Sequence, residues 1–109
     1  MNSNHRRMGL IPPLNGLRLF EAAARCGSFK LAAQELDLIP GAVSHGINAL
    51  EKWLDVALFD RKRGLVLTPA GLDYLEYVSG ALSMISKGTS DLLDAHQNRC
   101  DSKPPSGQR

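Results

Sequence analysis

The sequence has few of the residues that build disulfide scaffolds and metal centres. Its 109 residues include only two cysteines, Cys26 and Cys100, and three histidines, His5, His45 and His96. Two isolated cysteines do not make a disulfide framework, and the histidines lie too far apart to pair as metal ligands. We therefore expect no disulfide, no metal and no cofactor, with Cys26 acting as a small apolar side chain near a helix end.

Features of membrane proteins and enzymes are also missing from the sequence. The longest apolar runs are too short to cross a bilayer, and the N-terminus, with Arg6 and Arg7, lacks the apolar core of a secretory signal. The ten glycines are dispersed and form no phosphate-binding loop. The acidic residues are scattered, and no motif pairs one of them with a base or nucleophile. The sequence predicts a cytoplasmic protein without a membrane partner and without enzymatic activity.

The net charge of +2 is unevenly distributed along the chain. Up to Thr68 there are nine Lys or Arg against six Asp or Glu, whereas residues 69–94 carry one lysine and four acids. A basic front half suits contact with phosphate, and an acidic segment after it suits contact with a partner.

Two short helical patterns separated by a tight turn lie between Phe29 and Leu54. The first, residues 29–36, has small residues where a second helix would press against it, namely Ala32 and Ala33. The second, from residue 40 to about 54, has one apolar face at spacings of four, three and four, made by Val43, Ile47, Leu50 and Leu54. Its other face carries hydrogen-bonding side chains, namely Ser44, His45 and Asn48. This pattern indicates a helix-turn-helix, which lets a helix enter the major groove of DNA.

The segments on either side of this motif predict two more elements. A first helix is expected over about residues 14–26, with a buried stripe of Leu17, Phe20, Ala23 and Ala24, and Gly27 at its end. Ser28 is a good N-cap for the helix that follows. Apolar runs flank a basic turn at residues 61–64, which predicts a two-stranded hairpin over about 57–67.

A long final helix is expected over residues 69–94, beginning at Thr68-Pro69. Steps of three and four alternate along a heptad seam of Leu75, Val78, Leu82, Ile85 and Leu92, with Thr89 at the remaining step. Because Phe20, Val43, Ile47 and Leu50 would already close the core, this seam should have no partner within the chain. We expect it to form a homodimer interface. Residues 95–109 are polar and are expected to be disordered.

Several spaced motifs, taken in order, resemble the N-terminal DNA-binding domain of LysR-type transcriptional regulators. They are Leu17-Arg18-Leu19-Phe20-Glu21-Ala22, Gly27-Ser28-Phe29 with Ala32-Ala33 and Leu36, Pro40-Gly41-Ala42-Val43-Ser44 with Ile47, Leu50-Glu51, Leu58-Phe59 with Arg61, and Leu67-Thr68 with Ala70-Gly71. The opening residues 12–18 are similar to the branch that includes glycine-cleavage and beta-lactamase regulators. The resemblance covers residues 12 to about 94.

This resemblance implies a mainly α fold, a winged helix-turn-helix over residues 12–68, with the helix-turn-helix at about 28–54 and a β-hairpin wing at about 57–67. Residues 69–94 would be the linker helix through which two subunits pair, typically antiparallel. The implied function is sequence-specific binding of double-stranded DNA in transcription regulation, in the cytoplasm and at the nucleoid when DNA is bound. The family's effector domain would begin where this chain stops, so no small-molecule effector site is expected here.

The candidate DNA contacts on the third helix follow from the resemblance and the polar face. Ser44 and His45 are expected at base edges and nearby phosphates, because hydroxyl and imidazole groups can hydrogen-bond there. Pro40 and Gly41 open the helix and would contact thymine methyl groups or let the backbone approach closely. Asn48 lies further along and would contact phosphate.

The other candidate contacts come from the second helix and the hairpin. Lys30 and the start of the second helix would form an anion site, where Ser28 also caps the helix. Arg61, Lys62 and Arg63 would form a wing that reaches the neighbouring minor groove. A solvated basic turn is the alternative for these three residues.

Three features depart from the family pattern. Ile39 stands where Ser or Thr usually caps the third helix, and Gly46 stands where a glutamine that reads bases is common. The turn at residues 61–64 is one residue shorter than usual. Two alternative functions stay open. One is a truncated regulator without effector sensing, and the other is a winged-helix protein-interaction module that no longer binds DNA.

Overall fold

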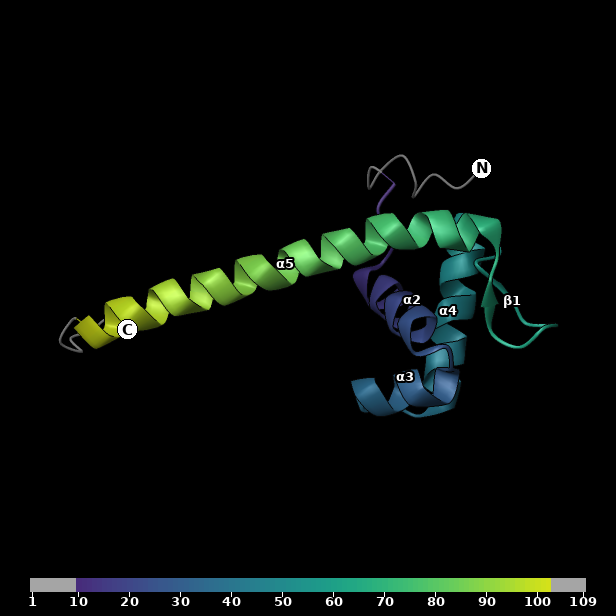
Figure 1. Cartoon of the computed structure of the whole chain (residues 1–109), viewed down its shortest axis with the longest axis horizontal. Coiled ribbons are helices and arrows are strands. Elements are labelled where there is room, and N and C mark those ends of the chain that lie inside the picture. The colour runs from purple at the N-terminus through teal and green to yellow at the C-terminus, as the bar shows by residue number, and fades with distance from the viewer. Residues whose placement is uncertain (1–9, 103–109) are drawn as a thin grey trace. The chain divides into compact units, whose positions relative to one another are not determined.

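The computed structural model describes the backbone of residues 10–102 and the side chains of residues 10–97. In chain order its elements are α2 (Leu14–Cys26), α3 (Phe29–Leu36), α4 (Pro40–Leu54), β1 (Phe59–Asp60), β2 (Val66–Leu67) and α5 (Pro69–Ser102), as Figure 1 shows. The chain divides into two compact units, Met1–Ser79 and Gly80–Arg109, and α5 belongs to both. Within the described part, no helix is both long and apolar enough to span a bilayer.

Local chemistry explains where the first three helices begin and end. Gly27 ends α2 in the left-handed conformation, with a φ of 70° that glycine adopts without strain. The Ser28 hydroxyl then accepts a hydrogen bond from the Leu31 amide at 3.1 Å, which caps α3 as expected. Asp37 and Asp55 end α3 and α4, each with a φ of 61°. Aspartate tolerates this left-handed geometry better than most side chains, which explains why both acids stand at helix ends.

Helices α2, α3 and α4 pack against one another in pairs and surround an apolar core. The expected buried face of α4 is confirmed at Val43, Ile47 and Leu50, and Leu54 is half-buried. The buried stripe of α2 was predicted incompletely. Its fully buried side chains are Leu19, Phe20, Ala22 and Ala23, whereas Leu17 and Ala24 are half-buried. The buried face of α2 is wider because α3 and α4 both pack on it, and Phe20 also contacts Phe59 and Tyr74.

Four aromatic rings link α2 and α3 to the hairpin and the start of α5. Phe20 contacts Phe59 edge-to-face at 5.7 Å between ring centroids, and it stacks on Tyr74 at 5.9 Å. Phe29 also contacts Phe59 edge-to-face, at 6.2 Å between ring centroids. Burial in this cluster raises the pKa of the Tyr74 hydroxyl. The hairpin and α5 therefore complete a core that the three helices leave open.

The seam of α5 consequently has a partner at its first end. Val78 is 4% exposed and lies within the first compact unit, and Leu75 is half-buried. The expectation that the whole seam lacks a partner within the chain is wrong at Val78, because three helices do not close the core by themselves. Further along, Ile85 and Leu92 are exposed, and Leu82 is half-buried.

Thr68 joins the hairpin to α5. In the hairpin, β1 pairs antiparallel with β2, and Phe59 lies opposite Leu67. The Thr68 amide donates to the Leu58 carbonyl at 3.0 Å, and its hydroxyl donates to the Ala57 carbonyl at 2.7 Å. The same hydroxyl accepts from the Gly71 amide at 3.0 Å, which confirms Thr68 as the cap of α5.

Helix α5 is longer than the sequence predicted. It continues past Asp94 to Ser102, so residues 95–102 are helical instead of disordered, and residues 103–109 lie outside the described range. Neither glycine nor proline interrupts this stretch before Pro104, and Ala95 and Gln97 favour a helix. The polar composition of residues 95–102 therefore did not predict where α5 ends.

Gly71 should be essential to the packing of α5 on the hairpin. A β-carbon there would lie 2.1 Å from the Leu58 carbonyl oxygen, a backbone atom that cannot move without disturbing the hairpin. We expect Gly71→Ala to lower the free energy of unfolding by about 3 kcal/mol, the upper end of typical overpacking. In the same helix, Gly80 has open space around it. Gly80→Ala should therefore stabilise by up to about 1 kcal/mol. Urea unfolding measures both variants, and equal effects would contradict the close approach at Gly71.

Candidate nucleic-acid interface

The predicted contact residues of α4 lie on one outer face. Pro40, Gly41, His45 and Asn48 are exposed, and Ser44 is half-buried. Their alternating steps of one and three residues place them on one side of a helix. The opposite side is held by Val43, Ile47 and Leu50, which are at most 2% exposed. The structure therefore brings the five residues together on a surface whose orientation is set by core packing.

The N-terminus of α4 begins with an apolar residue at the cap. Ile39 makes no side-chain hydrogen bond to the helix, which agrees with its lack of an acceptor. Its carbonyl accepts from the amides of Ala42 at 3.0 Å and Val43 at 3.4 Å. The side chain is 71% exposed, next to Pro40 at the start of the helix. The missing cap costs about 1 kcal/mol relative to Ser or Thr.

The location of Gly46 differs from the one that the sequence predicts. We expected it on the exposed face, as a missing base-reading side chain. It is half-buried, and a β-carbon there would lie 2.2 Å from Cδ1 of Leu19, a core residue that is 2% exposed. Position 46 therefore faces α2, and the glycine allows the two helices to approach closely with Leu19 between them. Helical periodicity alone did not reveal this contact because Gly46 borders both faces.

The hairpin is attached to α4 by Glu51. Its carboxylate accepts hydrogen bonds from the amides of Leu58 at 2.6 Å and Phe59 at 3.1 Å, and it pairs with Nη1 of Arg61 at 3.0 Å. The Glu51 side chain is only 12% exposed. The Arg61 guanidinium also lies 5.6 Å from the ring centroid of Phe29, a cation–π distance. In the sequence, Glu51 stands out only as part of the Leu50-Glu51 family motif, because no spacing rule pairs it with residues 58–61.

The three basic residues of the hairpin therefore have different surroundings. Arg61 is engaged with Glu51 and Phe29, whereas Lys62 and Arg63 are exposed at the turn. The Lys62 amide donates to Oδ1 of Asp60 at 3.1 Å, and Gly64 adopts a φ of 85° that suits glycine. The turn thus holds two exposed cations on an ordered backbone.

At the start of α3, the two predicted residues have separate surroundings. The Ser28 oxygen is used in capping the helix, and Lys30 is exposed two residues later. The first turn of α3 contains no acidic residue, so nothing there opposes the positive end of the helix dipole.

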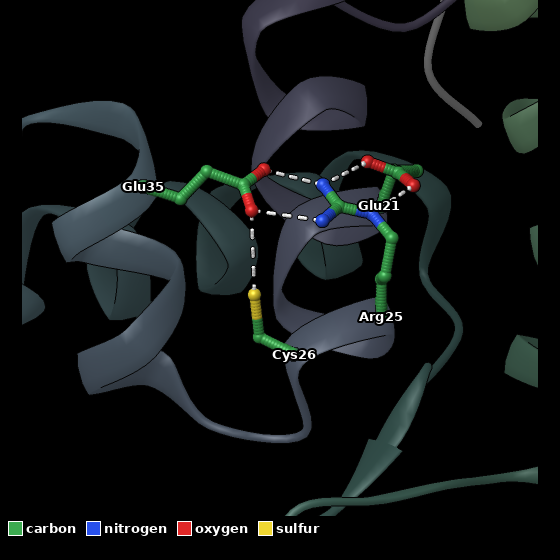
Figure 2. A network of polar contacts seen from close by, with 4 residues as sticks. All are labelled: Glu21, Arg25, Cys26 and Glu35. Carbon is green, nitrogen blue, oxygen red and sulfur yellow. Dashed lines mark hydrogen bonds and ion pairs between the residues drawn. The ribbon is translucent and has the colours of Figure 1, made fainter.

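A separate polar cluster joins the end of α2 to α3, as Figure 2 shows. Arg25 bridges Glu21, at 2.8 Å from Nε, and Glu35, which it contacts through two guanidinium nitrogens. Arg25 lowers the pKa of the Glu35 carboxyl by hydrogen bonding and charge. The Cys26 thiol donates a hydrogen bond to the Glu35 carboxylate at 3.7 Å. Burial and the negative charge of Glu35 raise the pKa of the Cys26 thiol. The thiol therefore stays protonated near neutral pH and is half-buried at the helix end.

Among the described residues, the cluster around Arg25 included, no group of three or more His, Cys, Asp or Glu side chains is placed to hold a metal ion.

The family model for the bacterial regulatory helix-turn-helix protein, lysR family, matches residues 14–72. This chain belongs to the LysR family. The match includes all three core helices, the hairpin and the first turn of α5.

Similar curated proteins are transcriptional regulators. The regulator PerR of Escherichia coli is 47% identical over 88 residues, which are 80% of this chain and 29% of that protein. The glycine cleavage system transcriptional activator of the same organism is 45% identical over 83 residues, covering 75% and 27%. The carbapenem-hydrolyzing beta-lactamase transcriptional activator of Enterobacter cloacae is 48% identical over 75 residues, covering 68% and 25%. The chain thus spans less than a third of the length of these relatives.

Solved structures agree with the winged-helix fold. The DNA-binding domain of BenM in complex with catB site 1 DNA has a TM-score of 0.72 and 28% identity, covering 81% of this chain and 96% of that one. Vibrio fischeri DarR in complex with DNA has a TM-score of 0.69 and 27% identity, covering 80% and 30%. The predicted mainly α winged helix-turn-helix is therefore confirmed.

Because Arg61 contacts Glu51 and Phe29 whereas Lys62 and Arg63 are exposed, we expect substitutions at these positions to have two different effects. Lys62→Gln with Arg63→Gln should reduce the slope of log affinity for duplex DNA against log salt by about 0.9 for each phosphate that is no longer neutralised, with stability unchanged. Arg61→Gln should instead lower the free energy of unfolding by about 1 kcal/mol, because Glu51 loses its cationic partner, and should leave most of the slope. Salt titrations and urea unfolding test this. The reverse assignment of the two effects would refute it.

Proposed function

We propose that this chain binds double-stranded DNA sequence-specifically as a transcriptional regulator, with α4 as the recognition helix. The observation that carries the proposal is the outer face of α4, where hydrogen-bonding side chains lie opposite a fully buried apolar face. A helix held this firmly can place its outer residues in a major groove at a defined depth. Relatives of similar fold in complex with DNA support the same role for this domain.

Within α4, Ser44 and His45 are the residues proposed to read base edges. The Ser44 hydroxyl can donate or accept, and the His45 imidazole can donate to the acceptors of guanine. Pro40 and Gly41 begin the same face and would let the backbone come close to the groove. Asn48 lies two turns further along, where a phosphate contact is the better fit.

Phosphate contacts are proposed for the exposed cations outside α4. Lys30 stands at the start of α3, where the helix dipole adds to its charge. Lys62 and Arg63 at the hairpin turn would follow the duplex into the neighbouring minor groove. In this arrangement Ser28 and Arg61 hold the backbone that presents those cations, through the helix cap and the pair with Glu51.

Replacing Ser44 and His45 with alanine tests the recognition surface. We expect a loss of about 1–3 kcal/mol for each base-edge interaction that is removed, seen as a smaller difference in affinity between a selected duplex and a random one. Folding should be preserved because neither side chain is part of the buried face. Ser86→Ala with Ser90→Ala, on the exposed surface of α5, is the matched control. Unchanged discrimination in the Ser44/His45 variant would remove these residues from the interface.

Selection of sites from random duplex DNA separates this proposal from the protein-interaction alternative. A module that contacts only proteins would yield no consensus and an affinity for DNA that hardly responds to salt. A regulator fragment without effector sensing would bind the selected sites in the absence of any small molecule.

We further propose that two copies pair through α5. Ile85 is 53% exposed and Leu92 is 66% exposed, and Leu93 beside them is 57% exposed, so the second compact unit carries an apolar stripe at the surface. A second helix with the same stripe would bury it, since apolar residues at alternating three- and four-residue steps favour helix pairing. Two linked domains would then bind two half-sites on one duplex, which strengthens a modest dimer.

Lysine at positions 82 and 85 tests the dimer. Leu82→Lys with Ile85→Lys should give a folded monomer that binds DNA much more weakly, because charge would be buried in the seam. Ser83→Lys with Ser90→Lys adds the same charge away from the seam and should stay dimeric. Sedimentation equilibrium distinguishes them. A wild-type chain that is monomeric at high micromolar concentration and also on DNA would rule out this interface.

A further inference from the structure

Ile39 is an exposed apolar side chain on an ordered backbone. It is 71% exposed, and its φ and ψ of −90° and 151° are those of an extended N-cap. The residues before it are fixed by the left-handed Asp37, whose amide donates to Gln34, and by the Leu38 amide, which donates to the Ala33 carbonyl at 2.8 Å. The Ile39 carbonyl is itself held by the first amides of α4. The Cα from which the side chain projects is therefore held at a definite place.

That place is the N-terminal end of the outer face of α4. Ile39 directly precedes Pro40 and Gly41, which share this face with Ser44, and the first turn of α4 contains no acidic residue. Pro40 has no amide hydrogen, and neither Ile39 nor Gly41 has a polar side chain. This end of the helix therefore offers mainly apolar contact, whereas the next turn offers hydrogen bonds. An apolar tip on a recognition helix would contact an apolar group of the DNA.

A major groove offers one apolar group of this kind, the C5 methyl of thymine. We infer that Ile39 is a specificity-determining residue that packs against a thymine methyl group in each half-site. The inference rests on the proposed function, because it takes α4 to be the recognition helix. It also explains why Ile39 stands at the N-cap of α4, where the family usually has Ser or Thr. Isoleucine offers methyl groups for contact with DNA, whereas Ser or Thr offers a hydroxyl that caps the helix. Branching at Cβ also limits the side chain to few rotamers, which suits a fixed contact.

The test uses a duplex selected from random DNA, in which each thymine is replaced in turn by uracil. This substitution removes the methyl group and leaves every hydrogen-bonding group in place. For the wild-type chain, one thymine in each half-site should be sensitive, with affinity falling by about fourfold, the effect expected for one buried methyl group. Cytosine placed at that position should bind more weakly than 5-methylcytosine by a similar factor.

The Ile39→Ser variant should lose this sensitivity and bind thymine and uracil duplexes equally. It should remain folded, with a urea midpoint equal to or above that of the wild type, because serine can cap α4. Leu72→Ser, a change at a residue of similar exposure in α5, is the control and should keep the thymine preference.

The outcomes distinguish the two proposals. A selected consensus with no uracil-sensitive thymine would overturn the role of Ile39 and leave sequence-specific binding intact. A sensitive thymine that stays sensitive in Ile39→Ser would also overturn it, because another residue would then make the contact. Failure to select any consensus would overturn the proposed function, and the inference would fall with it.

Discussion

The carboxylate of Glu51 holds the hairpin to α4, and the geometry of the domain depends on it. One side chain of α4 accepts two backbone amides at the start of the hairpin and pairs with Arg61. Arg61 in turn lies over Phe29 of α3. Since Glu51 is largely shielded from water, these bonds are stronger than the same contacts at an open surface. The helix-turn-helix and the hairpin therefore act as a single rigid support.

The aromatic cluster provides the second part of this support. Phe59 contacts both Phe20 and Phe29, while Tyr74 stacks on Phe20. Phe59 thus joins the hairpin to the helical core, and Gly71 allows the start of α5 to approach the hairpin backbone closely. Because each ring contacts at least one other element, movement of the hairpin would disturb the whole core.

On this rigid support, the outer surface of α4 changes character along its length. Ile39 and Pro40 offer apolar contact at the N-terminal end, and Ser44, His45 and Asn48 offer hydrogen bonds beyond it. The exposed cations proposed to contact phosphate stand elsewhere, at Lys30, Lys62 and Arg63. Such a division suits DNA, where base edges carry sequence information and phosphates carry most of the charge. The cluster around Arg25 is separate and stabilises the junction of α2 and α3.

The sequence by itself determined the features that depend on near neighbours in the chain. Gly27, Ser28 and Thr68 set helix boundaries, and the periodicity of α4 identified its buried residues, because turns, caps and helical faces follow local rules. Only the tertiary structure decided that Gly46 faces Leu19, that Val78 is buried and that Arg61 pairs with Glu51. These contacts join residues that are distant in the sequence, and their partners are set by how whole elements pack, which local periodicity does not encode.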